Sequence, residues 1–336
     1  MSNASRRGDQ AAAVTIGRNE GERLRRCLES IPRSIGRTVY VDSGSSDGSV
    51  ELARRRGAEV VELDMRAPFT AARARNAGIA RALEIAGGEL DFVLVLDGDC
   101  ELASGFVERA LSTMKADARV AVVCGRRREK HRDASTYNTL CDMEWDTPVG
   151  EAETCGGDAL IRMSAFREAG GYDDAVIAGE EPELCLRLRR HGWAVRRIEG
   201  DMTFHDAAMS RFSQWWRRAV RAGHAYAELY ARHRYWRREV RSVLVFGLVV
   251  PALALTAAPA TGGLSLGLFG LYGVVFVRAR GHRRSRGDVA RDASLYARYC
   301  VVAKFAHLAG MARYVASRAL GKRPVIIEYK QASTVG

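Results

Sequence analysis

The stretch FVLVLDGDCE, residues 92–101, contains a run of apolar residues that leads directly into Asp97, Gly98 and Asp99. A short apolar run that ends in turn-forming residues is typical of a strand buried in a sheet. Alternate residues of an extended strand point the same way, so both carboxylates are expected together at the strand end. Two neighbouring carboxylates repel one another unless a cation joins them, and Mg²⁺ and Mn²⁺ prefer oxygen ligands. The stretch therefore favours a metal site, with an exposed Asp-Gly turn as the alternative.

Short apolar runs alternate with helical patterns on both sides of this stretch, from residue 12 to about residue 124. Strands are expected at residues 12–17, 38–42, 58–63, 91–97 and 119–125, with helices between them. Strands that are apolar on both faces and separated by helices predict an α/β fold, with a mostly parallel sheet flanked by helices. Ligands of such sheets bind at the carboxyl ends of the strands, which is where Asp97 lies.

Two further stretches place polar groups near the same predicted edge. Asp42 ends the second expected strand, and the small residues after it in VDSGSSDGS leave room for a ligand. Arg75, in ARARNAG, lies near the start of a helix, where a guanidinium can bind a phosphate through paired hydrogen bonds. The ordinary alternatives are a capped loop for Asp42 and a solvated helix face for Arg75.

The alternation breaks down after residue 125. Residues 126–136, RRREKHRDAST, are expected to form an exposed charged loop. Further along, Pro182 suits the first turn of a helix, which places Glu181 at the helix N-terminus. The helix dipole there favours an ionised carboxylate, and an ionised carboxylate can act as a general base. The alternative is an acid that only caps the helix.

The segment 242–277 contains no charged residue. One membrane helix needs about 20 apolar residues, so the segment is too long for one span and slightly short for two. APATGG in its middle is a candidate turn, and arginines flank the segment on both sides, which places both flanks in the cytoplasm. The prediction is an apolar hairpin, either spanning or re-entrant, and the alternative is a buried helical pair. The preceding residues 209–236 form a basic, aromatic-rich helical pattern that suits a membrane interface.

The net charge of +12, from 52 Lys and Arg against 40 Asp and Glu, is compatible with several anionic partners. The basic residues gather around the apolar segment, so lipid headgroups explain them better than nucleic acid does. The seven cysteines are scattered singly, which favours free thiols in a reducing compartment. The N-terminal residues contain no apolar core of signal-peptide length, so secretion is not expected.

Taken in order, these motifs resemble glycosyltransferase family 2, in particular its membrane-associated bacterial members, and imply the GT-A nucleotide-sugar fold. The resemblance covers about residues 14–223 and rests on TIGRNE, VDSGSSDGS, ARNAG, LDGDC, CGGDALIRMSAFREAGGYD and GEEPELCLRLRRHG. The sequence departs from the family pattern at Gly17 and Arg18, at Ser43, and at Glu181, where the family has aspartate. QWWRR is similar to a motif of processive synthases, but Arg218 replaces its tryptophan, so processivity is not inferred.

The resemblance implies a donor site and a metal site. Asp42 would hold the nucleotide base with Glu20 beside it, and Arg18 belongs to the donor-binding opening. Arg75 would approach the donor phosphates.

The implied cofactor is Mn²⁺ or Mg²⁺. Asp97 would contact the ribose or the metal, and Asp99 would bind the metal. His205 would be a further metal ligand, or else a structural histidine.

The acceptor side follows from the same resemblance. Gly156, Gly157 and Asp158 would belong to the acceptor-side strand. Glu181 would deprotonate the acceptor hydroxyl, and the adjacent Glu180 could share that role.

The implied function is an inverting transfer of sugar from a nucleotide-diphosphate sugar to a hydroxyl or lipid-phosphate acceptor, in bacterial polysaccharide or glycolipid synthesis. The expected location is the cytoplasmic face of the inner membrane, with membrane lipids as partners. The expected domains are residues 12–223, with a donor half to residue 124 and an acceptor half from residue 125, and a helical region at residues 224–336. Alternatives are a nucleotidyltransferase, although TIGRNEGER has no lysine for a phosphate loop, and a degenerate subunit of a glycan-assembly complex.

Overall fold

The computed structural model describes residues 10–321, which fold into two compact units. The first unit comprises residues 10–131 and 144–207, and the second comprises residues 132–143 and 208–321. The sequence-based boundary at residue 223 falls inside helix α8 (Phe212–His233). Residues 322–336 of the expected C-terminal region lie outside the described residues.

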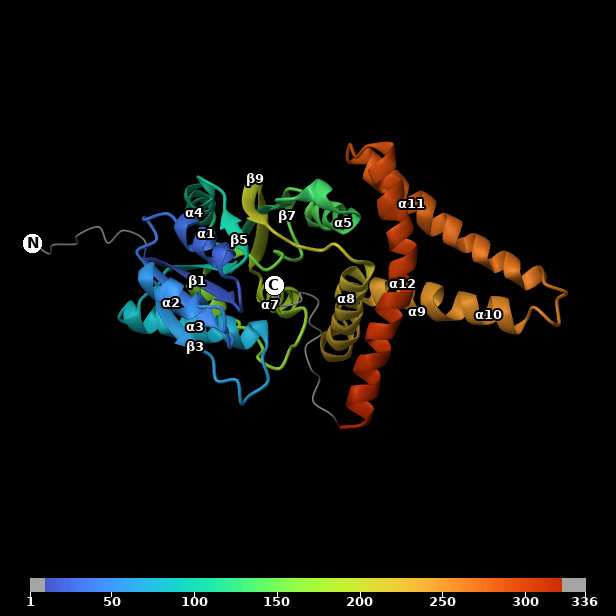
Figure 1. Ribbon diagram of the computed structural model, residues 1–336, viewed down its shortest axis with the longest axis horizontal. Helices are drawn as coiled ribbons and strands as arrows, with labels where there is room; N and C mark the ends of the chain where they lie inside the picture. Colours follow the sequence, from blue (N-terminus) through green and yellow to red (C-terminus); the bar gives the residue numbers. More distant parts are fainter. Residues whose placement is uncertain (1–9, 322–336) are drawn as a thin grey trace, which may run out of the picture. The chain divides into compact units, whose positions relative to one another are not determined.

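A nine-stranded sheet forms the centre of the first unit (Figure 1). Its strands are β1 (Ala11–Gly17), β2 (Arg37–Asp42), β3 (Glu59–Glu62), β4 (Phe92–Asp97), β5 (Cys100–Leu102), β6 (Val120–Glu129), β7 (Gly150–Glu151), β8 (Ala159–Arg162) and β9 (Ala194–His205). The strand order is β3-β2-β1-β4-β8-β6-β9-β5, and β7 pairs with β9. All five strands expected between residues 12 and 125 are confirmed, as β1, β2, β3, β4 and β6.

The sheet is mixed. Strands β3, β2, β1 and β4 pair in parallel, as do β6 and β9. Strand β8 runs antiparallel between β4 and β6, so the last strand of the expected parallel series does not pair with the one before it. The sequence pattern of residues 12–125 does not indicate that residues 159–162 insert as a strand between β4 and β6.

Helices cover both faces of the sheet, as the apolar strands require. The helices of the first unit with their bounds are α1 (Glu22–Ser30), α2 (Ser49–Arg55), α3 (Ala71–Ile85), α4 (Phe106–Ala116), α6 (Met163–Glu168) and α7 (Glu180–Arg190). Alternate residues of β1 face opposite ways: Val14 packs in the core with α3, α6 and α7, and Ala13 packs in the core with α1 and α4. Each fully buried valine or leucine in these two layers contributes roughly 1.5–3 kcal/mol.

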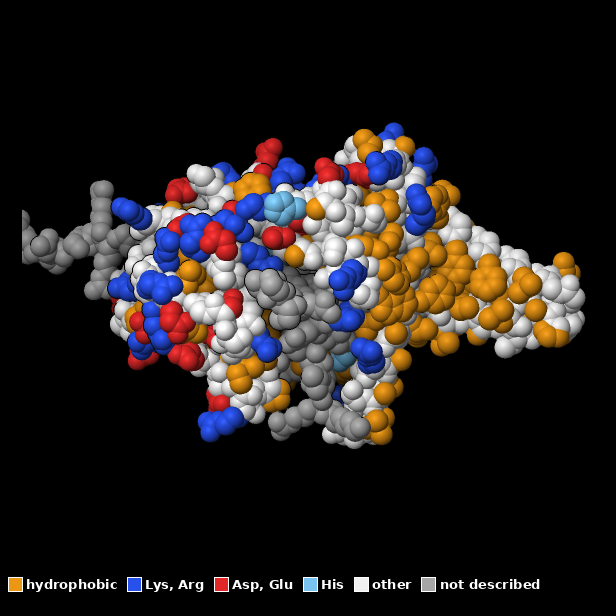
Figure 2. Space-filling view, in the orientation of Figure 1, with side chains coloured by type: hydrophobic (Ala, Val, Ile, Leu, Met, Phe, Trp, Pro, Cys, Tyr) orange, Lys and Arg blue, Asp and Glu red, His pale blue; other side chains and the backbone are white. Residues whose placement is uncertain are grey.

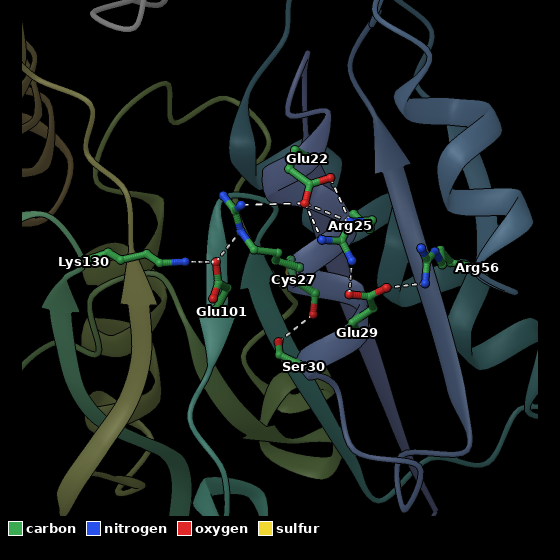
Figure 3. Close-up of polar contacts among 9 residues, drawn as sticks. Glu22, Arg25, Cys27, Glu29, Ser30, Arg56, Glu101 and Lys130 are labelled. Atoms are coloured by element: carbon green, nitrogen blue, oxygen red, sulfur yellow. Dashed lines mark hydrogen bonds and ion pairs between the residues drawn. The ribbon is translucent and has the colours of Figure 1, made fainter.

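Charged side chains connect α1 to its neighbours (Figure 3). Glu29 pairs with Arg56, which follows α2, and Glu101 of β5 pairs with Arg26 and with Lys130. These pairs are partly exposed to solvent, so each contributes at most about 1 kcal/mol. These ion pairs lie at the surface of the first unit, and its core consists of apolar residues.

The second unit is helical. Besides α8 and the short helix α5 (Thr136–Trp145), which begins in this unit, it contains α9 (Arg237–Leu244), η2 (Val245–Val249), α10 (Val250–Thr256), η3 (Leu264–Gly270), α11 (Leu271–Ser285) and α12 (Ala290–Ala319). Glycines allow close helix contacts. A Cβ atom at Gly223 of α8 would lie 2.1 Å from the carbonyl oxygen of His307, and one at Gly310 of α12 would lie 2.0 Å from that of Val220. At Gly247 of η2 it would lie 2.8 Å from the carbonyl oxygen of Lys304.

The apolar segment forms a helical hairpin, here defined as residues 237–285. Two helices, Arg237–Thr256 and Leu264–Ser285, are long and apolar enough to cross a membrane. At 1.5 Å per residue each is about 30 Å long, which matches the hydrocarbon thickness of a bilayer. The predicted turn at APATGG is confirmed, with positive φ at Gly262 and Gly263. The helices extend into the flanking arginines, so the hairpin is longer than the uncharged segment alone.

Large apolar side chains cover the surface of the hairpin (Figure 2). They include Leu244, Leu248, Val249, Leu253, Leu255, Leu264, Leu266, Phe269, Leu271, Val274 and Val277, all exposed. Only 28% of the apolar window of the first helix and 0% of that of the second is buried within the described residues. A contiguous apolar surface of this kind is unusual for a water-exposed face and typical of an interaction site.

Candidate active site

The parallel strands bring Asp42 and Asp97 to the same edge of the sheet. Asp42 ends β2 opposite Gly17 of β1, and Asp97 ends β4 opposite Ile16 of the same strand. One strand therefore separates the two carboxylates at the carboxyl edge. This is the arrangement expected from the sequence for these two residues.

Asp42 is buried and fixed by its own loop. Its Oδ1 accepts a hydrogen bond from the Tyr40 hydroxyl at 3.0 Å, and its Oδ2 accepts from the amides of Gly44 and Ser45 at 2.9 and 2.8 Å. The small residues after the strand allow the chain to turn back so that these amides point at the carboxylate. The carboxylate is therefore held in one orientation at the edge of the sheet.

The loop after β1 packs against the loop after β2. Asn19, at φ 55°, donates its amide to Ser45 Oγ at 2.9 Å and accepts from the Ser46 amide at 2.8 Å. Glu20 forms an ion pair with Arg23 at 2.8 Å. A Cβ atom at Gly17 would lie 3.0 Å from Glu20 Cγ, and one at Gly98 would lie 3.5 Å from it. Glu20 thus lies near the ends of β1 and β4, beside Gly98, the residue that follows Asp97.

Arg18, the other residue expected at this opening, is exposed. Its side chain is therefore accessible on the surface beside the carboxyl edge.

Five charged residues form a cluster at this edge, called here the charged cluster. Asp97 Oδ1 accepts from Arg75 at 2.8 Å, and Asp97 Oδ2 lies 3.3 Å from Arg127. Arg75 also donates to Glu180 at 2.6 Å, and Arg127 lies 2.6 Å from Asp158. Burial opposes the charge on Arg75, which is 3% exposed, but the carboxylates of Asp97 and Glu180 outweigh it and raise its pKa. The cluster holds two fully charged guanidinium groups among three carboxylates.

Arg127 lies in residues 126–136, which the sequence pattern predicts to form an exposed loop. That expectation is wrong for the first four residues, because β6 continues to Glu129. Arg127 points inward and lies 5.6 Å from the ring centre of Trp145. The signal available in the sequence was the unbroken run from Val120 into RRRE, in which a strand can carry alternate side chains inward.

The stretch Gly156-Gly157-Asp158 lies against the charged cluster. Both glycines have positive φ, 86° and 98°. A Cβ atom at Gly157 would lie 3.2 Å from Arg127 Nη2 and 3.6 Å from Arg75 Nη2. Asp158 is buried and accepts hydrogen bonds from the Asp97 amide at 3.0 Å and from Thr203 at 2.9 Å. Gly157 thus lets the backbone approach the guanidinium groups, and a side chain there would press on Arg127 in particular.

Asp97 and Asp99 contact different partners. Strand β4 ends at Asp97, a turn follows, and β5 begins at Cys100, so the alternation expected of one extended strand does not continue to Asp99. Asp99 is buried, and its Oδ2 lies 3.3 Å from His205 Nε2. The Sγ of Cys100 lies within 4.8 Å of the same two donor atoms.

His205 is held from its other side. Its Nδ1 is 3.8 Å from Glu129 Oε2, and its ring lies edge-on to Trp145 with centroids 4.8 Å apart. Glu129 in turn accepts hydrogen bonds from the amides of His131 and Ala207 at 3.0 and 2.9 Å. The buried Glu129, also missed from the sequence, therefore places a negative charge on the side of the imidazole away from Asp99.

Glu180 and Glu181 begin α7 but face different surroundings. Glu180 pairs with Arg75, whereas Glu181 accepts hydrogen bonds from the Cys155 amide and from the Cys185 thiol, the latter at 3.4 Å. From the sequence alone, the helix N-terminus is expected to favour the ionised form of Glu181. Burial instead raises the pKa of Glu181, although hydrogen bonds from Cys155 and Cys185 act in the opposite direction. Desolvation outweighs the dipole because the carboxyl group is almost fully enclosed.

Part of the chain matches a known protein family. Residues 13–168 match the model of glycosyl transferase family 2. The succinoglycan biosynthesis protein ExoA of Rhizobium meliloti is 26% identical over 195 residues, which are 53% of this chain and 57% of that protein. Glycosyltransferase AglE of Haloferax volcanii is 23% identical over 247 residues, which are 69% and 77% of the two chains. An N-acetylglucosaminyl-diphospho-decaprenol L-rhamnosyltransferase of Mycobacterium tuberculosis is 26% identical over 275 residues, which are 63% and 88%.

A solved structure shares the fold. The mannosyltransferase PcManGT of Pyrobaculum calidifontis, in complex with GDP-Man and Mn²⁺, is similar with a TM-score of 0.63 at 17% identity, covering 91% of this chain and 87% of that one. The matched residues include Arg75 and Asp99, together with Asp42 and Asp97, which end two strands at the carboxyl edge. The first unit therefore has the GT-A fold, and its residues 13–168 are similar to glycosyl transferase family 2.

Proposed function

We propose that the protein is a metal-dependent, inverting glycosyltransferase that moves a sugar from a nucleotide-diphosphate sugar to a hydroxyl or lipid-phosphate acceptor at a membrane. The observation that carries the proposal is the placement of a buried guanidinium, Arg75, and a partly buried one, Arg127, beside the Asp99–His205 pair at one edge of the sheet. Phosphates require cations, and a guanidinium can bind phosphate oxygens through two parallel hydrogen bonds. The relatives named above act in glycan synthesis, which supports polysaccharide or glycolipid synthesis as the process.

The residues at the edge fit a divalent cation. Asp99 and His205 are both buried, with donor atoms 3.3 Å apart, and the Glu129 carboxylate behind the imidazole is the kind of partner that orients a metal-binding histidine. A ligand set with an imidazole nitrogen favours Mn²⁺ over Mg²⁺, which strongly prefers oxygen. When bound, the cation would supply positive charge that stabilises the departing diphosphate. Asp97, whose oxygens already contact two arginines, is the weaker candidate ligand and the better candidate for the ribose.

The arginines are held ready for the donor. Asp97 contacts both Arg75 and Arg127. Glu180 forms a second ion pair with Arg75, and Asp158 forms a second ion pair with Arg127. Because they are fixed before a donor arrives, little reorganisation is required when charge develops on the leaving group. We assign Arg75 to the donor phosphates, and Asp42, held by the Gly44 and Ser45 amides, to the nucleotide base with Glu20 and Arg18 beside it.

The acceptor side is assigned to Gly156, Gly157 and Glu181. A carboxylate that is ion-paired with an arginine is a weak base, which argues against Glu180. Glu181 contacts the neutral amide of Cys155, and its raised pKa brings it closer to the range in which a general base works best. We therefore assign proton removal from the acceptor to Glu181 and the positioning of Arg75 to Glu180.

The hairpin supports a membrane location. Arg237, Arg238 and Arg241 begin its first helix, and Arg278, Arg280, Arg283 and Arg284 lie toward the end of its second. Both charged ends therefore lie at the open end of the hairpin, away from the turn, as the positive-inside rule expects for a hairpin that enters from the cytoplasm. We propose that the hairpin inserts into the cytoplasmic face of a bacterial inner membrane.

The test uses the purified full chain and a panel of nucleotide-diphosphate sugars. We expect one donor to raise the midpoint of thermal unfolding in the presence of Mn²⁺, and that donor to be hydrolysed or transferred. Asp99→Ala should abolish the metal dependence together with turnover, whereas Asp133→Ala, a 91% exposed aspartate of the second unit, should not.

Three results would contradict the proposal. Normal turnover by Asp99→Ala would refute the metal assignment. Release of pyrophosphate from a nucleoside triphosphate would indicate a nucleotidyltransferase. Failure to bind any member of the panel would indicate a non-catalytic subunit of a glycan-assembly complex.

A further inference from the structure

Two thiols and a carboxylate meet beside the acceptor-side loop. Glu181 and Cys185 lie one turn apart on α7, so both side chains occupy the same face of the helix. Cys155 lies in the loop immediately before Gly156. The sulfur atoms of Cys155 and Cys185 are 3.8 Å apart, and Glu181 Oε1 is 3.4 Å from the Cys185 sulfur. All three donor atoms lie within 4.8 Å of one another.

These separations match the edges of a tetrahedral zinc site. Two sulfur atoms bound at about 2.3 Å from one zinc ion, at the tetrahedral angle, lie about 3.8 Å apart. A sulfur atom and a carboxylate oxygen, bound at about 2.3 and about 2.0 Å, lie about 3.5 Å apart. A disulfide instead requires the two sulfur atoms to approach to about 2.05 Å. The observed 3.8 and 3.4 Å match the first arrangement and not the second.

We propose that Cys155, Glu181 and Cys185 form a second cation site, selective for zinc and similar thiophilic divalent ions. The ligand set differs from the Asp99–His205 pair, because two thiolates favour a softer ion than a carboxylate and an imidazole do. Three protein ligands leave the fourth position of a tetrahedral ion to water. Cys155 is half-buried and the following Gly156 is exposed, so an ion can enter from solvent.

The site has a regulatory consequence, which rests on the proposed function. An ion bound there would occupy the carboxylate that we assign as the general base. It would also tie the loop of Gly156 and Gly157 to α7. Zinc is therefore an inhibitor of transfer that acts at the acceptor side, while Mn²⁺ supports transfer from the donor side.

The binding test uses Co²⁺ as a spectroscopic substitute for zinc, with the reduced full chain. Tetrahedral binding by thiolates gives a sulfur-to-cobalt charge-transfer band together with intense visible bands, and Zn²⁺ should displace both. We expect one bound ion of this type, lost in Cys185→Ser and in Cys155→Ser. Cys300→Ser, which changes a half-buried thiol of the second unit, should keep the bands, as should Cys100→Ser, which removes the thiol beside Asp99. Cys155 lies in a loop and is half-buried, so its variant remains informative if the buried Cys185→Ser fails to fold.

Several outcomes would overturn the site. These are the absence of a charge-transfer band in the wild-type chain, its persistence in Cys155→Ser, or its loss in Cys100→Ser. A thiol titration showing two fewer free thiols in unreduced wild-type chain, but not in Cys155→Ser, would show that the pair forms a disulfide instead.

A transfer assay distinguishes failure of the zinc site from failure of the proposed function. With saturating Mn²⁺, micromolar Zn²⁺ should inhibit transfer by the wild-type chain and inhibit Cys185→Ser much less. A chain that shows the cobalt bands but no transfer with any donor would refute the proposed function and leave the cation site in place.

Discussion

The charged cluster of the first unit and the hairpin of the second unit place their side chains in opposite ways. In the cluster, Arg75 and Asp158 are almost completely buried. In the hairpin, Leu253, Leu255 and Leu264 are 53%, 60% and 85% exposed. Charged residues are rarely buried, and large apolar residues rarely form a continuous exposed surface, so each region departs from the usual distribution.

The difference shows what each region is adapted to. Buried charges are costly unless each is paired, and in the cluster every guanidinium faces carboxylates. Exposed leucines forgo roughly 1.5–3 kcal/mol each that burial would provide. Neither arrangement is the one that would best stabilise its unit in water. Both departures agree with the proposed functions, a donor site for the cluster and membrane insertion for the hairpin.

The largest effect is expected at α7, where two adjacent acids have different surroundings. Glu181→Gln should lower kcat by about 100-fold or more, because it removes the general base. Glu180→Gln should lower it less and raise KM for the donor, because it frees one side of Arg75. Steady-state kinetics with the preferred donor would measure both. A larger loss of kcat in Glu180→Gln than in Glu181→Gln would transfer the base role to Glu180.

The hairpin gives the next effect. Leu253→Glu combined with Leu255→Glu should weaken binding to anionic vesicles by at least about tenfold, since a carboxylate is costly inside a bilayer. The matched control is Leu320→Glu, a leucine 66% exposed at the end of α12 and outside the hairpin. Sedimentation with vesicles measures the bound fraction. Equal binding by the double variant and the control would show that the hairpin does not enter the bilayer.

A smaller effect is expected at the glycine beside the charged cluster. Gly157→Ala should lower turnover by about tenfold, because its Cβ atom would displace Arg127 from the position it holds. Gly170→Ala provides the control for backbone strain, since Gly170 has φ 77° with open space around its Cβ position. Both variants should lose about 1–2 kcal/mol of stability from the positive φ. If turnover fell equally in both, strain rather than the arginine contact would be the cause.

The smallest effect concerns acid stability of the second unit. Burial lowers the pKa of His224 and of His307 from 6.5 to about 4. The unfolded chain therefore takes up protons between pH 6.5 and about pH 4 while the folded unit does not, so the free energy of unfolding falls as the pH drops through this window. Unfolding in detergent, followed by tryptophan fluorescence, would measure the slope.

The histidine prediction has its own control. A variant with His224→Phe and His307→Phe should lose this part of the slope, and His131→Phe, an exposed histidine of the first unit, should keep it. An unchanged slope in the double variant would assign the acid sensitivity to other groups.

The sequence contained enough information for the parallel part of the sheet and for the hairpin. Apolar runs such as residues 92–97 have no polar face, so a sheet covered on both sides follows directly. The hairpin follows from the absence of charge over residues 242–277. Pairing of β8 between β4 and β6 could not be predicted, because strand order depends on long-range contacts and not on local pattern.

The location of a site residue could be predicted where it follows from the end of a strand. It could not be predicted where it depends on contacts with residues distant in the sequence. Asp42 and Asp97 lie at the carboxyl edge because they end parallel strands. Arg127 and Glu129 belong to a stretch that looks solvent-exposed, and only their tertiary partners explain why Arg127 is partly buried and Glu129 buried. The protonation preference of Glu181 depends on how completely Cys155 and its neighbours enclose it, which no local pattern reveals.

The glycine contacts of the second unit have a mechanical consequence. At Gly223, Gly247 and Gly310 the backbones of α8, η2 and α12 touch with no side chain between them. Such contacts contain no side chains whose rotamers could adjust when one helix moves relative to another. A force applied to the first helix of the hairpin, such as the lateral pressure of surrounding lipid, would pass through η2 into α12 and from there into α8 as a nearly rigid movement.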